Sequence, residues 1–157
     1  MLKTPQTYSE KAKELFLDGY NCAQSVFCAF AQDYGFDFDT ALKLSSSFGG
    51  GMGRMREVCG AVSSMFLIAG LEFGYTSPDD DETKAQHYAR IQELANKFKS
   101  KYSTILCRNL LNLNVDENYN ESPIPEARTP KYYKERPCAE IVSEAAFLIA
   151  DYIKKHK

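Results

Sequence analysis

Apolar residues return every three or four positions along most of the chain, a spacing that places them on one face of a helix. Near the N-terminus, for example, Tyr8, Ala12 and Phe16 share a face opposite Glu10 and Lys13. The alternation typical of β-strands is weak throughout. In chain order, the pattern predicts helices around 8–16, from 22 to about 34, over 39–47, from about 56 to 73, from about 78 to 102, over 107–111 and from about 137 to 154.

Residues that commonly begin or end helices flank these segments. In chain order, the predicted boundary residues are the stop Gly19, the N-cap Asn21, the stop Gly35, the N-cap Asp39, the stop Gly74 and the N-cap Ser77, which is followed by Pro78. These positions divide the helical pattern into separate elements joined by short turns.

The two longest predicted helices carry distinct apolar faces. The first is expected to bury Tyr88, Ile91, Leu94, Ala95, Phe98 and Tyr102. The final helix has a wider face, made of Ile141, Val142, Ala145, Leu148, Ile149, Tyr152 and Ile153. A face this wide is typical of burial on two sides, either in the core or at a subunit interface, and we favour the core.

Two segments interrupt the helical pattern. Residues 49–60, GGGMGRMREVCG, contain five of the nine glycines and predict a flexible loop before a helix. Residues 113–137 contain four prolines and alternating charges, which predict an extended, irregular connection. The expected fold is therefore an all-α, single-domain helical bundle over residues 1–157, with a glycine-rich loop and one long proline-containing loop.

Composition places the chain among ordinary globular proteins. Of its 157 residues, 44% are hydrophobic and 25% are charged, with a formal net charge of −2 and an isoelectric point near 5.7. This charge balance lacks the basic character of a nucleic-acid-binding protein. The N-terminus shows no signal-peptide pattern, and the longest nearly uncharged stretch, 58–71, is shorter than the roughly 20 residues of a membrane span. We therefore expect a cytoplasmic protein with reduced thiols.

In a reducing compartment, the five cysteines are either buried core residues or reactive groups. Cys22, Cys59, Cys107 and Cys138 each fall near the predicted start of a helix, where the dipole favours the thiolate, which is both nucleophile and metal ligand. Four arginines each stand within five residues of one of these thiols, namely Arg54, Arg56, Arg108 and Arg136. Cys28 lies within an apolar helix and is expected to be structural.

The cysteine-containing segments resemble one known family. They are YNCAQSVFCAF, FGGGMGRMREVCGAVSSMFLIAGLEFG, CRNLL and RPCAEIVSEAA, and together they span nearly the whole chain. In this respect the sequence is similar to the C_GCAxxG_C_C family, small bacterial and archaeal proteins that are proposed to be redox-active and often accompany transporter genes. The resemblance implies a site made of the four widely spaced cysteines. The central motif differs here, because CGAVSS places Cys59 before Gly60 and Ser64 at the position of the last glycine.

Three functions remain open on these residues. The leading one is thiol–disulfide or electron-transfer chemistry at the four cysteines, as in a thiol-dependent oxidoreductase with an unknown redox partner. The second uses the same four thiolates as ligands of zinc or an iron–sulfur cluster. It is slightly less favoured because the short C-x(2–4)-C spacing of structural zinc sites is absent. The third is an oligomeric helical adaptor, either a homo-oligomer or one bound to a transporter component.

The glycine loop and the two histidines complete the candidate residues. GGGMGRM matches neither GxGxxG nor GK[ST], so a nucleotide site is disfavoured. Gly51, Gly53, Arg54 and Arg56 nevertheless form the candidate cofactor-binding or anion-binding set, beside the helix that carries Cys59. His87 and His156 have polar or charged neighbours and are predicted to be surface residues.

Overall fold

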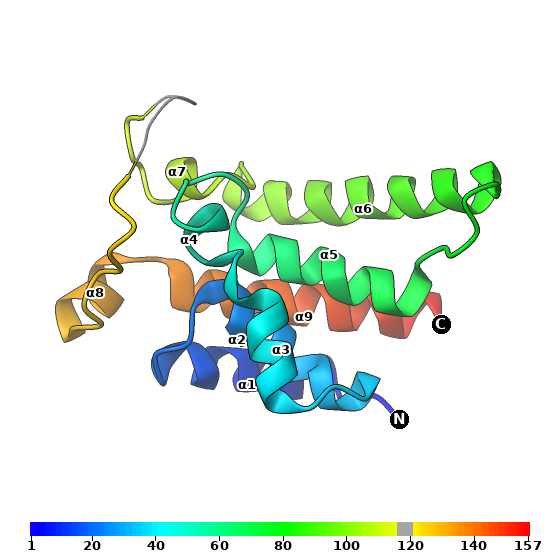
Figure 1. Ribbon diagram of the computed structural model, residues 1–157, viewed down its shortest axis with the longest axis horizontal. Coiled ribbons are helices and arrows are strands. Elements are labelled where there is room, and N and C mark those ends of the chain that lie inside the picture. Colours follow the sequence, from blue (N-terminus) through cyan, green and yellow to red (C-terminus); the bar gives the residue numbers. More distant parts are fainter. Residues whose placement is uncertain (116–120) are drawn as a thin grey trace.

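Helices make up most of the chain in the computed structural model, which describes residues 1–115 and 121–157 (Figure 1). The elements are, in order, α1 (Pro5–Leu17), α2 (Cys22–Ala31), the 3₁₀ turn η1 (Gln32–Tyr34), α3 (Phe38–Ser46), α4 (Gly49–Met52), α5 (Gly60–Phe73), α6 (Asp81–Tyr102), α7 (Cys107–Leu110), α8 (Pro130–Glu135) and α9 (Cys138–His156). The described residues contain no strand, only an isolated bridge between Val58 and Leu106. The predicted all-α fold is confirmed.

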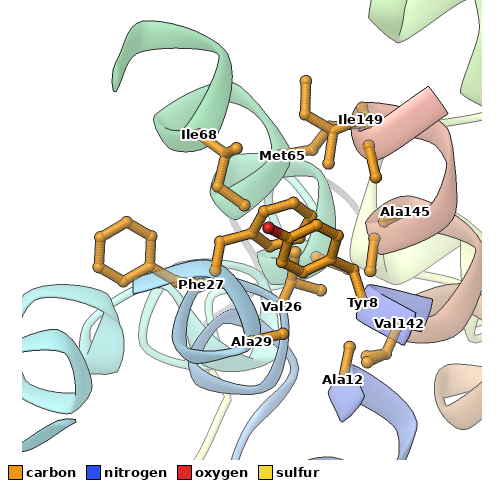
Figure 2. Packing of buried hydrophobic residues seen from close by; sticks show 14 of the residues in the cluster. Tyr8, Ala12, Val26, Phe27, Ala29, Met65, Ile68, Val142, Ala145 and Ile149 are labelled. Atoms are coloured by element: carbon orange, nitrogen blue, oxygen red, sulfur yellow. The ribbon is translucent and has the colours of Figure 1, made fainter. Parts of the chain in front are cut away.

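The core forms where α1, α2, α5 and α9 pack against one another. Figure 2 shows their apolar side chains meeting, with Tyr8 from α1, Phe27 from α2, Ile68 from α5 and Ile149 from α9. Tyr8 also stacks on Phe30, with ring centroids 3.9 Å apart. Burial of such side chains, each contributing about 1.5–3 kcal/mol, is the main source of stability in a bundle of this size.

The apolar face of α9 belongs to this core. Its buried residues are Ile141, Val142, Ala145, Ala146, Ile149, Ala150, Tyr152 and Ile153. They are covered within one chain by α1, α2, α5 and α6. The core interpretation of this face is therefore confirmed, and the face is not available as the adaptor surface that the sequence left open.

Several predicted helix boundaries are confirmed. Asn21 caps α2 by accepting from the Gln24 N–H (2.8 Å), and the Gln24 Oε1 in turn accepts from the Asn21 N–H (3.2 Å). This capping box makes Cys22 the first residue of α2. Gly35, with φ of 84°, ends η1, and Gly74 ends α5.

Other boundaries were predicted wrongly. The N-cap of α3 is Asp37, which accepts from the Thr40 N–H, and Asp39 lies inside the helix. The N-cap of α6 is Asp80, which accepts from the Thr83 N–H, and Ser77 lies outside. In both helices the aspartate with a threonine three residues later forms the cap, because its carboxylate reaches that N–H directly.

The burial of α6 also differs from the prediction. His87, expected at the surface, is 8% exposed and packs against the Tyr75 ring, and its burial lowers the pKa of the imidazole. Tyr88, expected in the buried stripe, is 51% exposed and shares a hydrogen bond with Tyr75 (3.0 Å). Leu94, Ala95 and Phe98 are buried as predicted.

The long connection contains more structure than the sequence suggested. The helix α8 forms within it, with Thr129 accepting from the Tyr132 N–H. Residues 116–120 of the predicted irregular segment lie outside the described residues. In the described parts of the chain, none of the helices combines the length and apolar character that a membrane crossing would require.

Candidate functional site: a cysteine and arginine cavity

The four candidate cysteines line one small cavity. Cys22, Cys59, Cys107 and Cys138 face it together, although 116 positions separate the first from the last in the chain. The cavity has a volume of about 70 Å³. Figure 1 shows why these positions meet, because α5, α7 and α9 all begin at the end of the bundle opposite the chain termini.

Helix starts position two of the thiols. Cys22 and Cys138 are the first residues of α2 and α9, as predicted, and both are partly exposed. Cys28 lies deeper in α2, away from the cavity lining, and is buried among core residues. This agrees with the structural role expected for Cys28.

An antiparallel bridge positions the other two thiols. It joins Val58 to Leu106, and the N–H groups of Cys59 and Cys107 donate to carbonyls across it (2.8 and 2.7 Å). Along an extended segment, successive side chains point to opposite faces. Cys59 follows Val58 and Cys107 follows Leu106, so both cysteine side chains project from the face opposite to Val58 and Leu106. They are 7% and 8% exposed.

The helix boundaries beside these two cysteines differ from the predicted ones. Cys59 is the N-cap of α5, which begins at Gly60 rather than near Arg56. Cys107 begins α7, a helix of only four residues whose N-cap is Leu106 rather than Ser103 or Thr104. A helix of four residues has little dipole to favour a thiolate at Cys107. The bridge between Val58 and Leu106 positions the two thiols instead.

Burial overrides the predicted tendency of these thiols to ionise. It is the largest cause of a raised pKa at Cys59, Cys107 and Cys138, and it raises the pKa of Cys138 to about 12. The negative charge that Cys22 would carry as a thiolate raises all three further. These thiols are therefore protonated at neutral pH.

Arg56 acts in the opposite direction on one of them. Its guanidinium donates to the Cys107 Sγ (3.6 Å) and lowers the pKa of that thiol, although burial has the larger effect. The Arg56 side chain is only 5% exposed. Among the described residues, this is the one hydrogen bond between an arginine and a cavity thiol.

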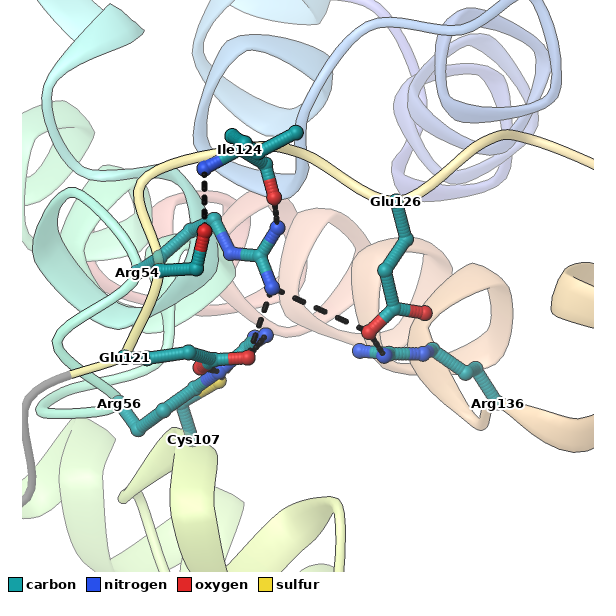
Figure 3. A network of polar contacts seen from close by, with 8 residues as sticks. Arg54, Arg56, Cys107, Glu121, Ile124, Glu126 and Arg136 are labelled. Carbon is teal, nitrogen blue, oxygen red and sulfur yellow. Dashed lines mark hydrogen bonds and ion pairs between the residues drawn. The ribbon is translucent and has the colours of Figure 1, made fainter.

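A layer of ion pairs covers Arg56 (Figure 3). Glu121 accepts from both Arg56 and Arg54, and Glu126 pairs with Arg136. The two guanidinium groups on Glu121 lower the pKa of its carboxyl to about 2. Arg108, also expected beside a thiol, instead pairs with Glu57 (3.4 Å) and does not line the cavity.

The glycine segment is a defined left-handed turn rather than a flexible loop. Five consecutive residues, 50–54, have φ between 60° and 70°. The left-handed conformation costs each residue other than glycine about 1–2 kcal/mol, and glycine avoids that cost at three of the five positions. The turn places Arg56 at the cavity.

Gly60 makes the closest approach to a candidate thiol. A Cβ at Gly60 would stand 2.6 Å from the Cys22 Sγ and 2.7 Å from the Phe48 carbonyl oxygen. One turn further along α5, the Ser64 hydroxyl donates to the Ala23 carbonyl (2.6 Å). The small residues of CGAVSS therefore let α5 lie directly on the start of α2, and Ser64 preserves this packing where the family motif has glycine.

The other predicted cofactor-binding residues are not brought to the cavity. Gly51 lies behind it, where a Cβ would stand 2.6 Å from the Cys107 Cβ, and Gly53 and Arg54 line an adjoining groove that shares Arg56 with the cavity. Only Arg56 of that set faces the thiols.

The cavity also contains residues that the sequence did not indicate. They are Arg128 and Tyr132, from the long connection and α8, and they join Arg136, which the sequence had already placed near Cys138. The sequence does not show that Arg128 and Tyr132 lie near Cys22 and Cys59, because they are far from these cysteines along the chain. A usable signal is the run EARTPKYYKERPC, which concentrates arginine and tyrosine just before Cys138.

The cavity contains the kind of donor atoms that a metal centre uses. Four thiols are a suitable donor set for zinc or an iron–sulfur cluster. Within residues 1–115 and 121–157, however, no three Cys, His, Asp or Glu side chains lie in an arrangement that would hold one metal ion. Among the described residues, the thiols thus share one cavity without three of them meeting in a metal-binding arrangement.

The raised pKa of Cys138 predicts a loss of stability at alkaline pH. The unfolded thiol deprotonates near its usual value of 9.0, whereas the folded thiol retains its proton to about 12. The contribution of this thiol is therefore complete below pH 9 and declines as pH rises toward 12. Urea unfolding across this range should show a shallower decline for Cys138→Ala than for the original protein. Equal slopes would contradict the raised pKa of this thiol.

Comparison with protein families gives one match. The model of a family described as "Putative redox-active protein (C_GCAxxG_C_C)" matches residues 20–152. These residues include all four cavity cysteines. Searches of curated proteins and of solved structures gave no significant match.

Proposed function

Because the chain belongs to the C_GCAxxG_C_C family, we propose that its cavity performs thiol–disulfide exchange, with Cys22 and Cys59 cycling between dithiol and disulfide. The observation that carries this proposal is the gathering of four widely spaced cysteines around one cavity. The family is described as redox-active, and a pair of nearby thiols is sufficient for that chemistry.

Cys22 is proposed as the attacking thiol. It is partly exposed, whereas Cys59 and Cys107 are buried. Its charge also affects the pKa of all three other thiols, which places its sulfur within electrostatic reach of each. A central and accessible sulfur suits the group that meets the substrate.

Cys59 is proposed as the resolving thiol. The neighbouring Gly60 packs directly on the Cys22 Sγ, and Cys22 is the largest electrostatic influence on Cys59. The absence of a side chain at Gly60 leaves the space in which the two sulfurs can approach. Cys107 and Cys138, which line the same cavity, are proposed to receive the disulfide by further exchange.

The proposed reaction reduces a small disulfide. The Cys22 thiolate attacks one substrate sulfur, forming a mixed disulfide and releasing the other half as a thiolate. That thiolate takes the proton of the Cys59 thiol. The Cys59 thiolate then attacks the Cys22 Sγ and releases the second half, which leaves as a thiol after protonation from solvent. The protein loses two electrons, and the substrate gains them as two thiols.

The proposal includes a reducing, cytoplasmic setting and a partner that regenerates the dithiol. Such a compartment keeps exposed thiols reduced between reactions. The raised pKa values of the buried thiols would further limit their reaction with unrelated oxidants, because the thiolate is the reactive form.

Counting thiols tests this function. Protein purified without oxygen should show five free thiols. Treatment with the neutral probe 2-hydroxyethyl disulfide should remove two without leaving probe on the protein, and dithiothreitol should restore them. Peptide mapping should identify Cys22 and Cys59.

Other results would reject the proposal. A stable probe adduct with no internal disulfide would exclude the resolving step. Stoichiometric iron or zinc in the anaerobic protein would favour the metal alternative. Five unreactive thiols without metal would favour an adaptor.

A further inference from the structure

The cavity wall is strongly positive. Arg56, Arg128 and Arg136 all line it, and they come from two distant segments of the chain. Among the described residues that line the cavity, none is Asp or Glu. Thiol exchange by itself needs no such set of cations, so the proposed chemistry leaves these arginines unexplained.

The surrounding carboxylates only partly balance this charge. Glu121 serves both Arg54 and Arg56, and Glu126 serves Arg136 (Figure 3). In the described part of the chain, these two carboxylates stand against four arginines, namely Arg54, Arg56, Arg128 and Arg136. The layer over the cavity retains two positive charges that these carboxylates do not match.

Arg128 is the cavity arginine that has no carboxylate partner among the described residues. Its two terminal nitrogens donate to the carbonyls of Phe16 and Tyr20 (both 3.0 Å), which fix the guanidinium at the end of α1. Its guanidinium carbon also lies over the Phe16 ring, 4.3 Å from the centroid, and over the Tyr132 ring at 5.0 Å. The guanidinium is thus held in a fixed orientation, and no carboxylate among the described residues pairs with it.

The cavity also limits the size of its occupant. Its volume of about 70 Å³ is small, and its remaining wall is largely apolar. The apolar residues are Phe16, Leu110, Leu111 and Ile141. A short apolar arm with one terminal anionic group would satisfy both the walls and the arginines.

We infer that the protein's substrate is a small disulfide that carries a carboxylate or a similar anionic group close to its sulfur atoms. This inference rests on the proposed function and names the substrate class for the same site. Arg128 and Arg136 bind the anionic group while the disulfide sulfur meets Cys22. Arg128 and Arg136 are positioning residues in this scheme, because they contact the substrate away from the reacting sulfurs.

Three disulfides of similar size test the charge preference directly. They are 3,3′-dithiodipropionate, which is anionic, 2-hydroxyethyl disulfide, which is neutral, and cystamine, which is cationic. Each rate is divided by the rate of the same probe with 2-mercaptoethanol, which removes differences in intrinsic reactivity. We expect the normalised rate to be at least about tenfold higher for the anionic than for the cationic probe at low salt. Sodium chloride should reduce this ratio.

Substitutions of the cavity arginines test whether they cause the preference for the anionic probe. Arg128→Gln and Arg136→Gln should each bring the anionic-to-cationic ratio several-fold closer to one. Arg128→Lys should restore much of it, because lysine keeps the charge while losing the planar contacts. Lys97→Gln removes an equally charged group from an exposed part of α6 and should leave the ratio unchanged. Circular dichroism and unfolding curves establish that each variant is folded.

The outcomes separate this inference from the proposed function. Equal normalised rates for the three probes would overturn the anionic substrate and leave thiol exchange intact. A preference that survives both arginine substitutions would overturn the assignment to Arg128 and Arg136. Failure of all three probes to produce an internal disulfide would overturn the exchange function itself.

Discussion

Gly51→Ala is expected to lower the free energy of unfolding by about 3 kcal/mol or more. Gly51 is buried and has φ of 70°, a left-handed conformation that costs an alanine about 1–2 kcal/mol. A Cβ there would also stand 2.6 Å from the Cys107 Cβ and 2.8 Å from the Glu57 nitrogen. Relief of these contacts requires the backbone to move, because the neighbours are not ends of flexible side chains. Urea unfolding measures the effect.

Gly53→Ala is the matched control for this substitution. Gly53 has nearly the same φ, 60°, but its closest neighbour to a new Cβ is the Ser47 carbonyl oxygen at 4.0 Å. It should therefore show only the conformational cost, about 1–2 kcal/mol. Equal destabilisation by the two substitutions would show that crowding at Gly51 is unimportant. A larger loss for Gly51→Ala would tie the glycine to the cysteine cavity.

The contrast between these glycines clarifies what the sequence could reveal. A dense group of glycines predicts unusual backbone, which the left-handed turn bears out. It does not reveal which glycine is required by backbone conformation and which by a close neighbour. At Gly51 that neighbour is Cys107, which lies 56 positions away. Only the folded chain brings the two together.

The helices were more predictable than the site because their signals are local. The apolar spacing and the capping box of Asn21 and Gln24 both lie within a few residues, so α2 begins where the sequence predicted. Where two polar residues compete to cap a helix, as at Asp37 and Asp39, the cap is the side chain that reaches the N–H three residues further on. His87 illustrates a stronger limit, because the Tyr75 segment that covers it approaches from outside its helix.

The pKa values of the cavity thiols also depend on contacts between segments that are distant in the sequence. Sequence position favours a thiolate at a helix start, as at Cys138. Burial, however, reflects how many distant segments converge there, and at Cys138 it exceeds the effect of Arg136 and Arg128. The same convergence brings Arg128 to Cys22, Cys59 and Cys107, which lie in distant parts of the sequence.

Cys22→Ser is expected to reduce formation of the internal disulfide by about 100-fold or more. Cys22 is the proposed point of entry, and the buried thiols Cys59 and Cys107 cannot meet a substrate without local opening. The substitution also removes one partner of an intramolecular reaction, whose advantage over a bimolecular step is of this order or greater. Serine is close in size to cysteine, so the packing of Gly60 against this position is largely preserved.

Cys28→Ala provides the control, because Cys28 lies in the same helix but outside the cavity lining. Quenching with a thiol-alkylating reagent after mixing with 2-hydroxyethyl disulfide, followed by mass spectrometry, measures the rates of both variants. The Cys28→Ala protein should still lose two thiols, whereas Cys22→Ser should retain its four remaining thiols over the same period. Rapid disulfide formation in Cys22→Ser would assign entry to another cysteine, and Cys138 would be the first to test because it too is partly exposed.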